Sequence, residues 1–136
     1  MGKTALLLEL AAKAEKMGFV TAGVLANKRM LDEIIQLIQI GGAKYVNKSS
    51  KKVKAIKVGV PGFSFGLTFL DEVKENYGFR VKLTLLCDAL AKCGKGLLIL
   101  IDEVYSGTEE IRELAATYQH LVGEGKDIAI AMAGLP

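Results

Sequence analysis

Histidine, cysteine, proline and tryptophan are scarce in this chain of 136 residues, which has one histidine, two cysteines, two prolines and no tryptophan. A single histidine leaves little room for a zinc site or for a histidine-based catalytic triad. Cys87 and Cys93 are too few for a disulfide scaffold and fit no metal-binding spacing, so reduced thiols are expected. Long apolar runs are also missing. The run from Leu97 to Ile101 is far too short to span a bilayer, and charged residues in the first turns exclude a signal peptide.

Apolar residues are nevertheless plentiful, because 51% of the chain is hydrophobic. This content excludes intrinsic disorder and suggests strands that are buried on both faces. The length predicts one domain, residues 1–136. Lysine and arginine number 18 against 15 acidic residues, and the net charge of +3 does not by itself indicate a nucleic-acid partner. We expect a cytoplasmic protein with no membrane partner.

The order of helical and strand patterns predicts an α/β fold, a three-layer sandwich around a mainly parallel sheet. The predicted strands span residues 19–26, 97–101 and 127–133. The predicted helices span residues 4–17, 30–40, 71–77 and 79–92, and a last helix follows Ser106. Between them, lysine alternation and a Pro61–Gly62 turn signal predict a solvated β-hairpin within residues 53–69. The six lysines between residues 44 and 57 could bind phosphate backbones, but a solvated hairpin protected by lysines is favoured because aromatic residues are sparse there.

Glycines and polar residues mark the expected ends of the helices. Gly18 and the pair Gly41–Gly42 are expected to end the first two helices, and Ser106 with Glu109 is expected to cap the last one. The first helix is predicted to bury Leu7, Leu10, Ala11, Ala14 and Met17. Helix 79–92 is predicted to bury Phe79, Leu83, Leu86, Cys87 and Leu90. The last helix is predicted to bury Ile111, Leu114, Ala115, Tyr118 and Val122. His120 is expected on the surface near a helix end.

Two motifs carry the chemistry. The first is Gly2-Lys3-Thr4 at the start of a predicted helix. In a phosphate-binding loop the glycine lets the backbone approach the phosphates, the lysine reaches the β and γ oxygens, and the threonine hydroxyl binds Mg²⁺. A complete loop needs a further glycine five residues earlier, after a strand, which this chain does not include. A solvated N-terminal lysine is the plain alternative.

The second motif is the apolar run Leu97 to Ile101 followed by Asp102 and Glu103, which is the Walker B pattern. A buried parallel strand delivers such carboxylates to its C-terminal edge, where open α/β sheets bind ligands. Asp102 would hold Mg²⁺ through water, and Glu103 would act as general base on the attacking water. The plain alternative is a pair of acids that opens a loop. The lysine motif comes first in the chain and the acidic strand later, with alternating helices and strands between them. This order favours a nucleotide site.

With these motifs, the chain resembles the core of an AAA-type P-loop ATPase, of the bacterial and archaeal group similar to replication-initiator ATPases. The resemblance implies ATP and Mg²⁺ as ligands, with Gly2, Lys3 and Thr4 at the phosphates and Thr4 and Asp102 at the metal. It also implies a partial domain, without the N-terminal strand and the C-terminal lid. The missing strand would leave neighbouring strands unpaired, so we expect strand rearrangement, self-association or a strand-exchanged dimer.

The chain departs from the family near the end of its last strand, where residues 131–134 offer no polar sensor. Three functions therefore stay open. The chain binds and hydrolyses ATP as part of a complete protein, or it is a nucleotide-gated switch that engages DNA or a protein with little turnover, or it is a remnant that no longer binds nucleotide. Cys87 and Cys93 are expected in or near the core, and the cysteines have no part in any of the three.

Overall fold

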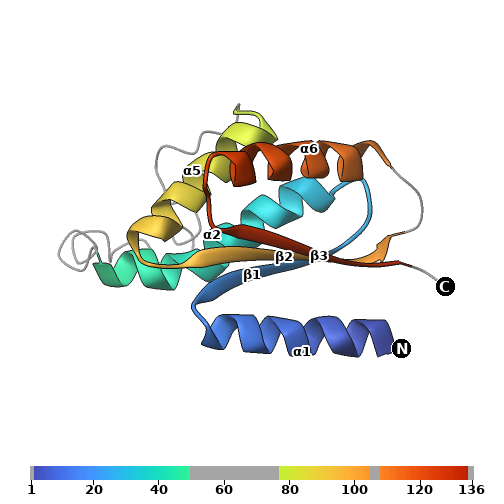
Figure 1. Cartoon of the computed structure of the whole chain (residues 1–136), viewed down its shortest axis with the longest axis horizontal. Coiled ribbons are helices and arrows are strands. Elements are labelled where there is room, and N and C mark those ends of the chain that lie inside the picture. The colour runs from blue at the N-terminus through green and yellow to red at the C-terminus, as the bar shows by residue number, and fades with distance from the viewer. Residues whose placement is uncertain (1, 50–76, 105–107, 135–136) are drawn as a thin grey trace, which may run out of the picture.

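The computed structural model describes residues 2–49, 77–104 and 108–134, which form a parallel three-stranded sheet with helices on both faces (Figure 1). In sheet order the strands are β1 (Phe19–Leu25), β2 (Gly96–Val104) and β3 (Ile128–Gly134). The helices are α1 (Gly2–Lys16), α2 (Met30–Ser49), α5 (Phe79–Lys92) and α6 (Glu109–Gly123). The expected α/β class with a parallel sheet is confirmed for these residues. The three strands pair directly in chain order, so no gap separates them.

The central strand β2 holds the core together because both of its faces are covered. Leu97, Ile99 and Ile101 are buried in the large cluster formed with α2, α5 and α6. Leu98 and Leu100 point to the other face, where Ala14 of α1 packs on them. A strand that is buried on both sides must be apolar at every position, which explains the continuous run that was read from the sequence.

Among the described residues, helix α1 is the one helix on its face of the sheet, and it lies below the sheet in Figure 1. Ala14 is buried, and Leu7 and Ala11 pack beside it, as predicted. The prediction was wrong for Leu10 and Met17, whose side chains are 39% and 76% exposed. A single helix on a sheet buries only a narrow stripe at the spacing i, i+4 and i+7, and no second helix covers its flanks among the described residues.

Helix α2 corrects a predicted boundary. The helix continues through Gly41 and Gly42 to Ser49 instead of ending at them. A Cβ atom on Gly41 would lie 3.1 Å from Cγ1 of Val20, so the missing side chain lets α2 approach β1 closely. This packing outweighs the intrinsic helix penalty of glycine, about 1 kcal/mol for each residue.

Helix α6 begins later than the capping box suggested. Its N-cap is Thr108, whose hydroxyl accepts a hydrogen bond from the backbone N–H of Ile111 at 3.3 Å, so the prediction of Ser106 as the cap was wrong. The buried face also differs from the predicted one. Thr117 and Leu121 are buried with Leu114, whereas Val122 is 45% exposed. Ile111 and Tyr118 pack against the core as predicted.

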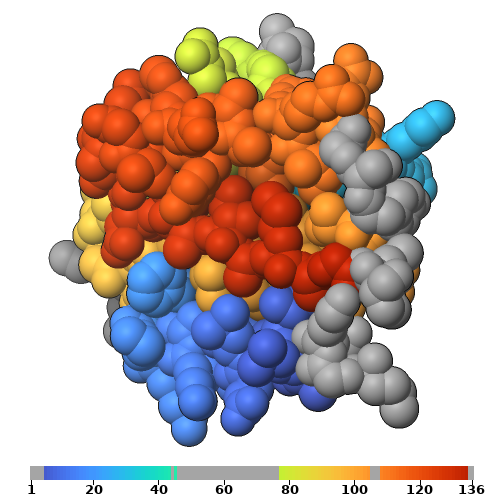
Figure 2. Space-filling view, turned by 45° about the vertical axis from the view of Figure 1, so that its right-hand side comes forward, coloured from blue at the N-terminus to red at the C-terminus, as the bar shows by residue number. Residues whose placement is uncertain are grey.

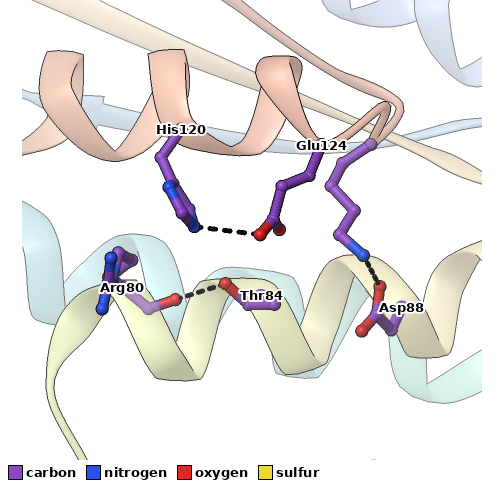
Figure 3. A network of polar contacts seen from close by, with 6 residues as sticks. Arg80, Thr84, Asp88, His120 and Glu124 are labelled. Atoms are coloured by element: carbon purple, nitrogen blue, oxygen red, sulfur yellow. Dashed lines mark hydrogen bonds and ion pairs between the residues drawn. The ribbon is translucent and has the colours of Figure 1, made fainter.

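Helix α5 agrees with its prediction. It spans Phe79–Lys92 and buries Leu83, Leu86, Cys87 and Leu90. An ion pair joins α5 to the segment that leads into β3: Nζ of Lys126 lies 2.7 Å from Oδ1 of Asp88 (Figure 3). On α6, His120 lies near the helix end, where its Nε2 is 3.2 Å from a carboxylate oxygen of Glu124.

Strand β3 forms one edge of the sheet. It pairs with β2 only, within the described residues, and most of its residues are half-buried. In Figure 2 its red surface lies between the blue α1 below and the orange α6 above. The predicted hairpin of residues 53–69, the predicted helix 71–77 for all but its last residue, and Ser106 lie outside the described residues. None of the described helices is long and apolar enough to cross a membrane.

Candidate functional site

The topology brings the two sequence motifs to the same edge of the sheet. Helix α1 and β1 are joined by a tight turn at Gly18, which has a φ of +96°. The helix therefore runs back along the strand, and its length of about 22 Å matches the roughly 23 Å of β1. The N-terminal end of α1 consequently lies beside the C-terminal ends of the strands, as Figure 1 shows at its right-hand side. This is the edge where open parallel sheets bind ligands.

A pocket of about 230 Å³ lies at this edge, between α1 and the ends of β1 and β2. Among the lining residues that the structure describes, Asp102 is the charged one and the others are apolar. The lining residues are Leu7, Leu8, Gly23, Val24, Leu25, Leu100 and Asp102. An apolar pocket with a single carboxylate at one end orients a ligand that has an apolar part and a part able to meet that carboxylate.

The structure describes the backbone of Gly2, Lys3 and Thr4 as the first turn of α1. Lys3 and Thr4 precede the pocket residues Leu7 and Leu8 by four positions, which is one helical turn of about 5.4 Å. The backbone of the predicted phosphate motif therefore stands one turn beyond the pocket wall. The first N–H groups of a helix have no partner within the helix and carry the positive end of its dipole.

Asp102 and Glu103 lie at a local irregularity in the pairing of β2. The pairing of β2 with β3 shifts register between Ile101 and Val104, so the strand bulges at the two acids. Glu103 adopts a φ of 61°, in the left-handed region, and it is the one non-glycine residue described that does so. Its backbone N–H donates to Oδ1 of Asp102 at 2.8 Å. On the β1 side, the carbonyl of Asp102 accepts from the N–H of Ala26 at 3.0 Å.

The two acids differ in their surroundings. Asp102 is half-buried, lines the pocket and is fixed by its hydrogen bonds, whereas the side chain of Glu103 is exposed at the end of the strand. A left-handed conformation at a non-glycine residue costs about 1–2 kcal/mol, and such strain often marks functional positions. The strand end therefore presents one held carboxylate and one exposed carboxylate side by side.

Sequence reasoning missed the apolar part of the site. Gly23 was read as an ordinary strand residue, yet a Cβ atom there would meet nothing within 4 Å, so its missing side chain leaves the pocket open. A lone glycine inside a strand is a known signal of close approach or special geometry, and it could have pointed to the site. Leu7 was predicted as core, and the structure also makes it a pocket wall.

The described side chains at this site are too few to hold a metal ion without oxygen atoms from a bound ligand. In the described part of the chain, no three His, Cys, Asp or Glu side chains come together closely enough to hold one. The chemistry of Asp102 still fits Mg²⁺, which prefers oxygen ligands and commonly uses one or two carboxylates together with substrate phosphates. The residues present therefore suit a magnesium ion that arrives with a phosphate ligand.

The other candidate residues take no part in the pocket. Both cysteines are free thiols, as expected, with Cys87 buried and Cys93 half-buried. Burial, with a smaller contribution from the charge of Asp88, raises the pKa of the Cys87 thiol to about 12. A thiol with so high a pKa stays protonated and is a poor nucleophile.

Comparison of the chain with protein-family models, with curated proteins and with solved structures finds no significant match in any of the three. The functional interpretation therefore depends on the geometry of the pocket and on the chemistry of its residues.

Proposed function

We propose that this chain binds a nucleoside triphosphate, ATP, together with Mg²⁺ at the C-terminal edge of the sheet, and that it forms part of a protein that hydrolyses it. The observation that carries the proposal is the pocket between α1 and β2. Its walls join Leu7 and Leu8, one turn from Lys3 and Thr4, to Asp102 at the end of the strand. Two motifs far apart in the chain thus converge on one place.

The proposed roles follow from chemistry and position. The N–H groups at the start of α1, with Lys3, would attract the phosphates. Thr4 and Asp102 would hold Mg²⁺, whose contribution is to neutralise charge on the phosphate oxygens. The apolar walls around Gly23 would exclude water from one side of the ligand.

Glu103 is the proposed general base. Its exposed carboxylate stands beside Asp102, so a water near the bound phosphates would be within its reach. The left-handed backbone and the hydrogen bond from its N–H to Asp102 fix the direction in which the residue leaves the strand. In this proposal the Glu103 carboxylate is required for ATP turnover but not for ATP binding.

A nucleotide-gated switch with little turnover is the second candidate. The final residues of β3 lie beside the bulge, with Gly134 paired to Val104. They bring no polar side chain to this edge, because residues 131–134 are Ala, Met, Ala and Gly. A group that would position water from that side is therefore missing from β3, which favours binding without efficient hydrolysis.

Calorimetric titration of Mg-ATP into the chain tests the proposal. Binding that is lost in Lys3→Ala and retained in Lys13→Ala would support it, because Lys13 is an exposed lysine on the same helix at the far end from the pocket. The absence of binding by the unmodified chain, or equal binding by both variants, would contradict it.

A third variant tests the pocket itself. Gly23→Val adds three carbons where the structure leaves open space, so it should preserve the fold and narrow the pocket. Valine also suits a strand better than glycine, so the free energy of unfolding should not fall. We expect at least tenfold weaker binding with unchanged or higher stability. Retained affinity would place the ligand elsewhere.

Glu103→Gln then separates the two candidate functions, because it should abolish turnover in an ATPase and change little in a switch.

A further inference from the structure

The end of β2 departs from the regular alternation of a strand. In a regular strand successive side chains point to opposite faces, so residues three apart lie on different faces. Ile101 and Val104 are three apart, yet both pack in the core cluster that β2 forms with α2, α5 and α6. Asp102 lies on the other face, where it lines the pocket with Leu100. The strand therefore contains one residue too many between Ile101 and Val104.

The pairing with β3 identifies the extra residue. Ile101 pairs with Met132 and Val104 pairs with Gly134, so three steps along β2 match two steps along β3. A strand with one residue more than its partner has a β-bulge, and one residue of a bulge commonly adopts the left-handed region. Glu103 adopts that region, with a φ of 61°. Glu103 is therefore the inserted residue.

The bulge decides where the carboxylate of Glu103 lies. In a strand without a bulge, Glu103 would point to the face of Ile101 and Val104 would point to the face of Asp102. The carboxylate would then be directed at the apolar core, where an unpaired charge is costly. With the bulge, Val104 packs against the core and the side chain of Glu103 is exposed. Two acids that are adjacent in the sequence thus both reach the C-terminal edge of the sheet.

Gly134 allows the two strands to pair again directly after the bulge. A Cβ atom at Gly134 would lie 3.0 Å from the carbonyl oxygen of Val104, which is closer than Cβ atoms usually approach a backbone oxygen. A side chain there would have to displace either this carbonyl or the end of β3. Both adjustments would open the pair of Val104 and Gly134 that closes the bulge. Because Val104 directly follows Glu103, the inserted residue would then lose its support.

We propose that Gly134 is a positioning residue for Glu103. Its missing side chain lets β3 pair with β2 immediately after the two acids, and this pairing holds Glu103 in the left-handed region with its carboxylate at the edge. In this conformation the N–H of Glu103 donates to Oδ1 of Asp102 at 2.8 Å. The inference rests on the proposed function for the role of Glu103 as general base. The geometric part of it can be measured without nucleotide.

Asp102 is expected to keep its place when the bulge opens. It precedes the inserted residue, and its carbonyl accepts a hydrogen bond from the N–H of Ala26 at 3.0 Å. The pairing of β1 with β2 also runs to Leu25 and Asp102 without a shift in register. A substitution at Gly134 should therefore move Glu103 more than Asp102, and it should affect ATP turnover more than Mg-ATP binding.

Nuclear magnetic resonance of Gly134→Ala tests the geometry. Hydrogen exchange of the Glu103 amide should become at least about tenfold faster, because its hydrogen bond to Asp102 depends on the bulge. The matched control is Gly123→Ala, which adds the same methyl group at a glycine where a Cβ atom would have nothing within 4 Å. This control should leave the Glu103 amide unchanged. Circular dichroism checks that both variants are folded.

A double-mutant cycle gives a second readout that a general role in the strand would not produce. Glycine at position 103 can adopt many backbone conformations, so a bulge with Glu103→Gly should adjust to a side chain at position 134. The loss in urea midpoint caused by Gly134→Ala should therefore be smaller in the Glu103→Gly background than in the original chain. A Gly134 that supports only the end of β3 would cause the same loss in both backgrounds.

Turnover measurements connect the geometry to the proposed reaction. Gly134→Ala should lower kcat roughly tenfold to a hundredfold and leave the affinity for Mg-ATP little changed, because a displaced base slows the chemical step. An unchanged Glu103 amide in Gly134→Ala would overturn the inference, and so would an opened bulge with unchanged kcat. If the original chain binds no Mg-ATP while Gly134→Ala still opens the bulge, the proposed function fails and the geometric inference is supported.

Discussion

Replacing Glu103 with glycine should make the protein more stable, although the residue carries the proposed general base. Glu103 has a φ of 61° at the bulge of β2, where a Cβ atom crowds the following carbonyl. Glycine has no Cβ and adopts this region freely. The hydrogen bond from the residue 103 N–H to Oδ1 of Asp102 is made by the backbone, so the substitution retains it.

The expected gain is set by two opposing terms. Removing the left-handed penalty stabilises the folded chain by about 1–2 kcal/mol. The greater freedom of glycine in the unfolded chain offsets about 0.5–1 kcal/mol of this. We therefore expect a net increase of about 1 kcal/mol in the free energy of unfolding for Glu103→Gly. Glu103→Gln keeps the Cβ atom and should stay within about 0.5 kcal/mol of the original chain.

Urea denaturation measures the difference. With a slope of about 1–3 kcal/mol per molar urea, a gain of about 1 kcal/mol moves the midpoint up by roughly 0.3–1 M without a change in slope. Both variants lose the carboxylate, so both should lose ATP turnover if Glu103 is the base. If Glu103→Gly were no more stable than Glu103→Gln, the backbone at this position would carry no strain, and the reasoning about the bulge would be wrong.

Two further substitutions follow from close contacts and from burial. Gly96→Ala should lower the free energy of unfolding by about 1–3 kcal/mol, because its Cβ atom would lie 2.7 Å from Oδ2 of Asp127 and 2.8 Å from Cε2 of Phe19. Thermal denaturation measures the loss. The control is Gly123→Ala, because a Cβ atom at Gly123 would have nothing within 4 Å. The raised pKa of Cys87, about 12 in the folded chain, favours the folded state below pH 9, and this stability should be lost as pH rises from about 9 toward 12. Unfolding curves of the original chain and of Cys87→Ala should converge over that range, and parallel curves would refute the assignment.

Where the sequence predicted the fold correctly, local patterns and packing agreed. The run from Leu97 to Ile101 and the helix Phe79–Lys92 are apolar in the way that their positions require, so pattern and structure coincide. Gly41 shows the opposite case. Its local signal is a helix stop, but the approach of α2 to β1 needs a glycine there, and only the tertiary contact with Val20 reveals this.

The site could be predicted in part. The position of Asp102 and Glu103 at the end of a buried parallel strand followed from the motif, and the structure confirms that position. The pocket could not be predicted, because it is made by the absence of a side chain at Gly23 and by the direction in which α1 returns along β1. The left-handed backbone of Glu103 also depends on a register shift between strands that no local pattern encodes.

The parallel pairing of the strands has a consequence for the order in which the chain folds. The register that joins Phe19 to Gly96 closes a loop of 77 residues (96 minus 19), whereas the one that joins Leu97 to Ile128 closes 31 (128 minus 97). The longer closure costs about 0.8 kcal/mol more in chain entropy. The unit β2–α6–β3 is therefore expected to form first, with the two carboxylates already at its edge. The pocket is completed only when β1 and α1 arrive from the far end of the chain, which makes it the last part of the molecule to be assembled.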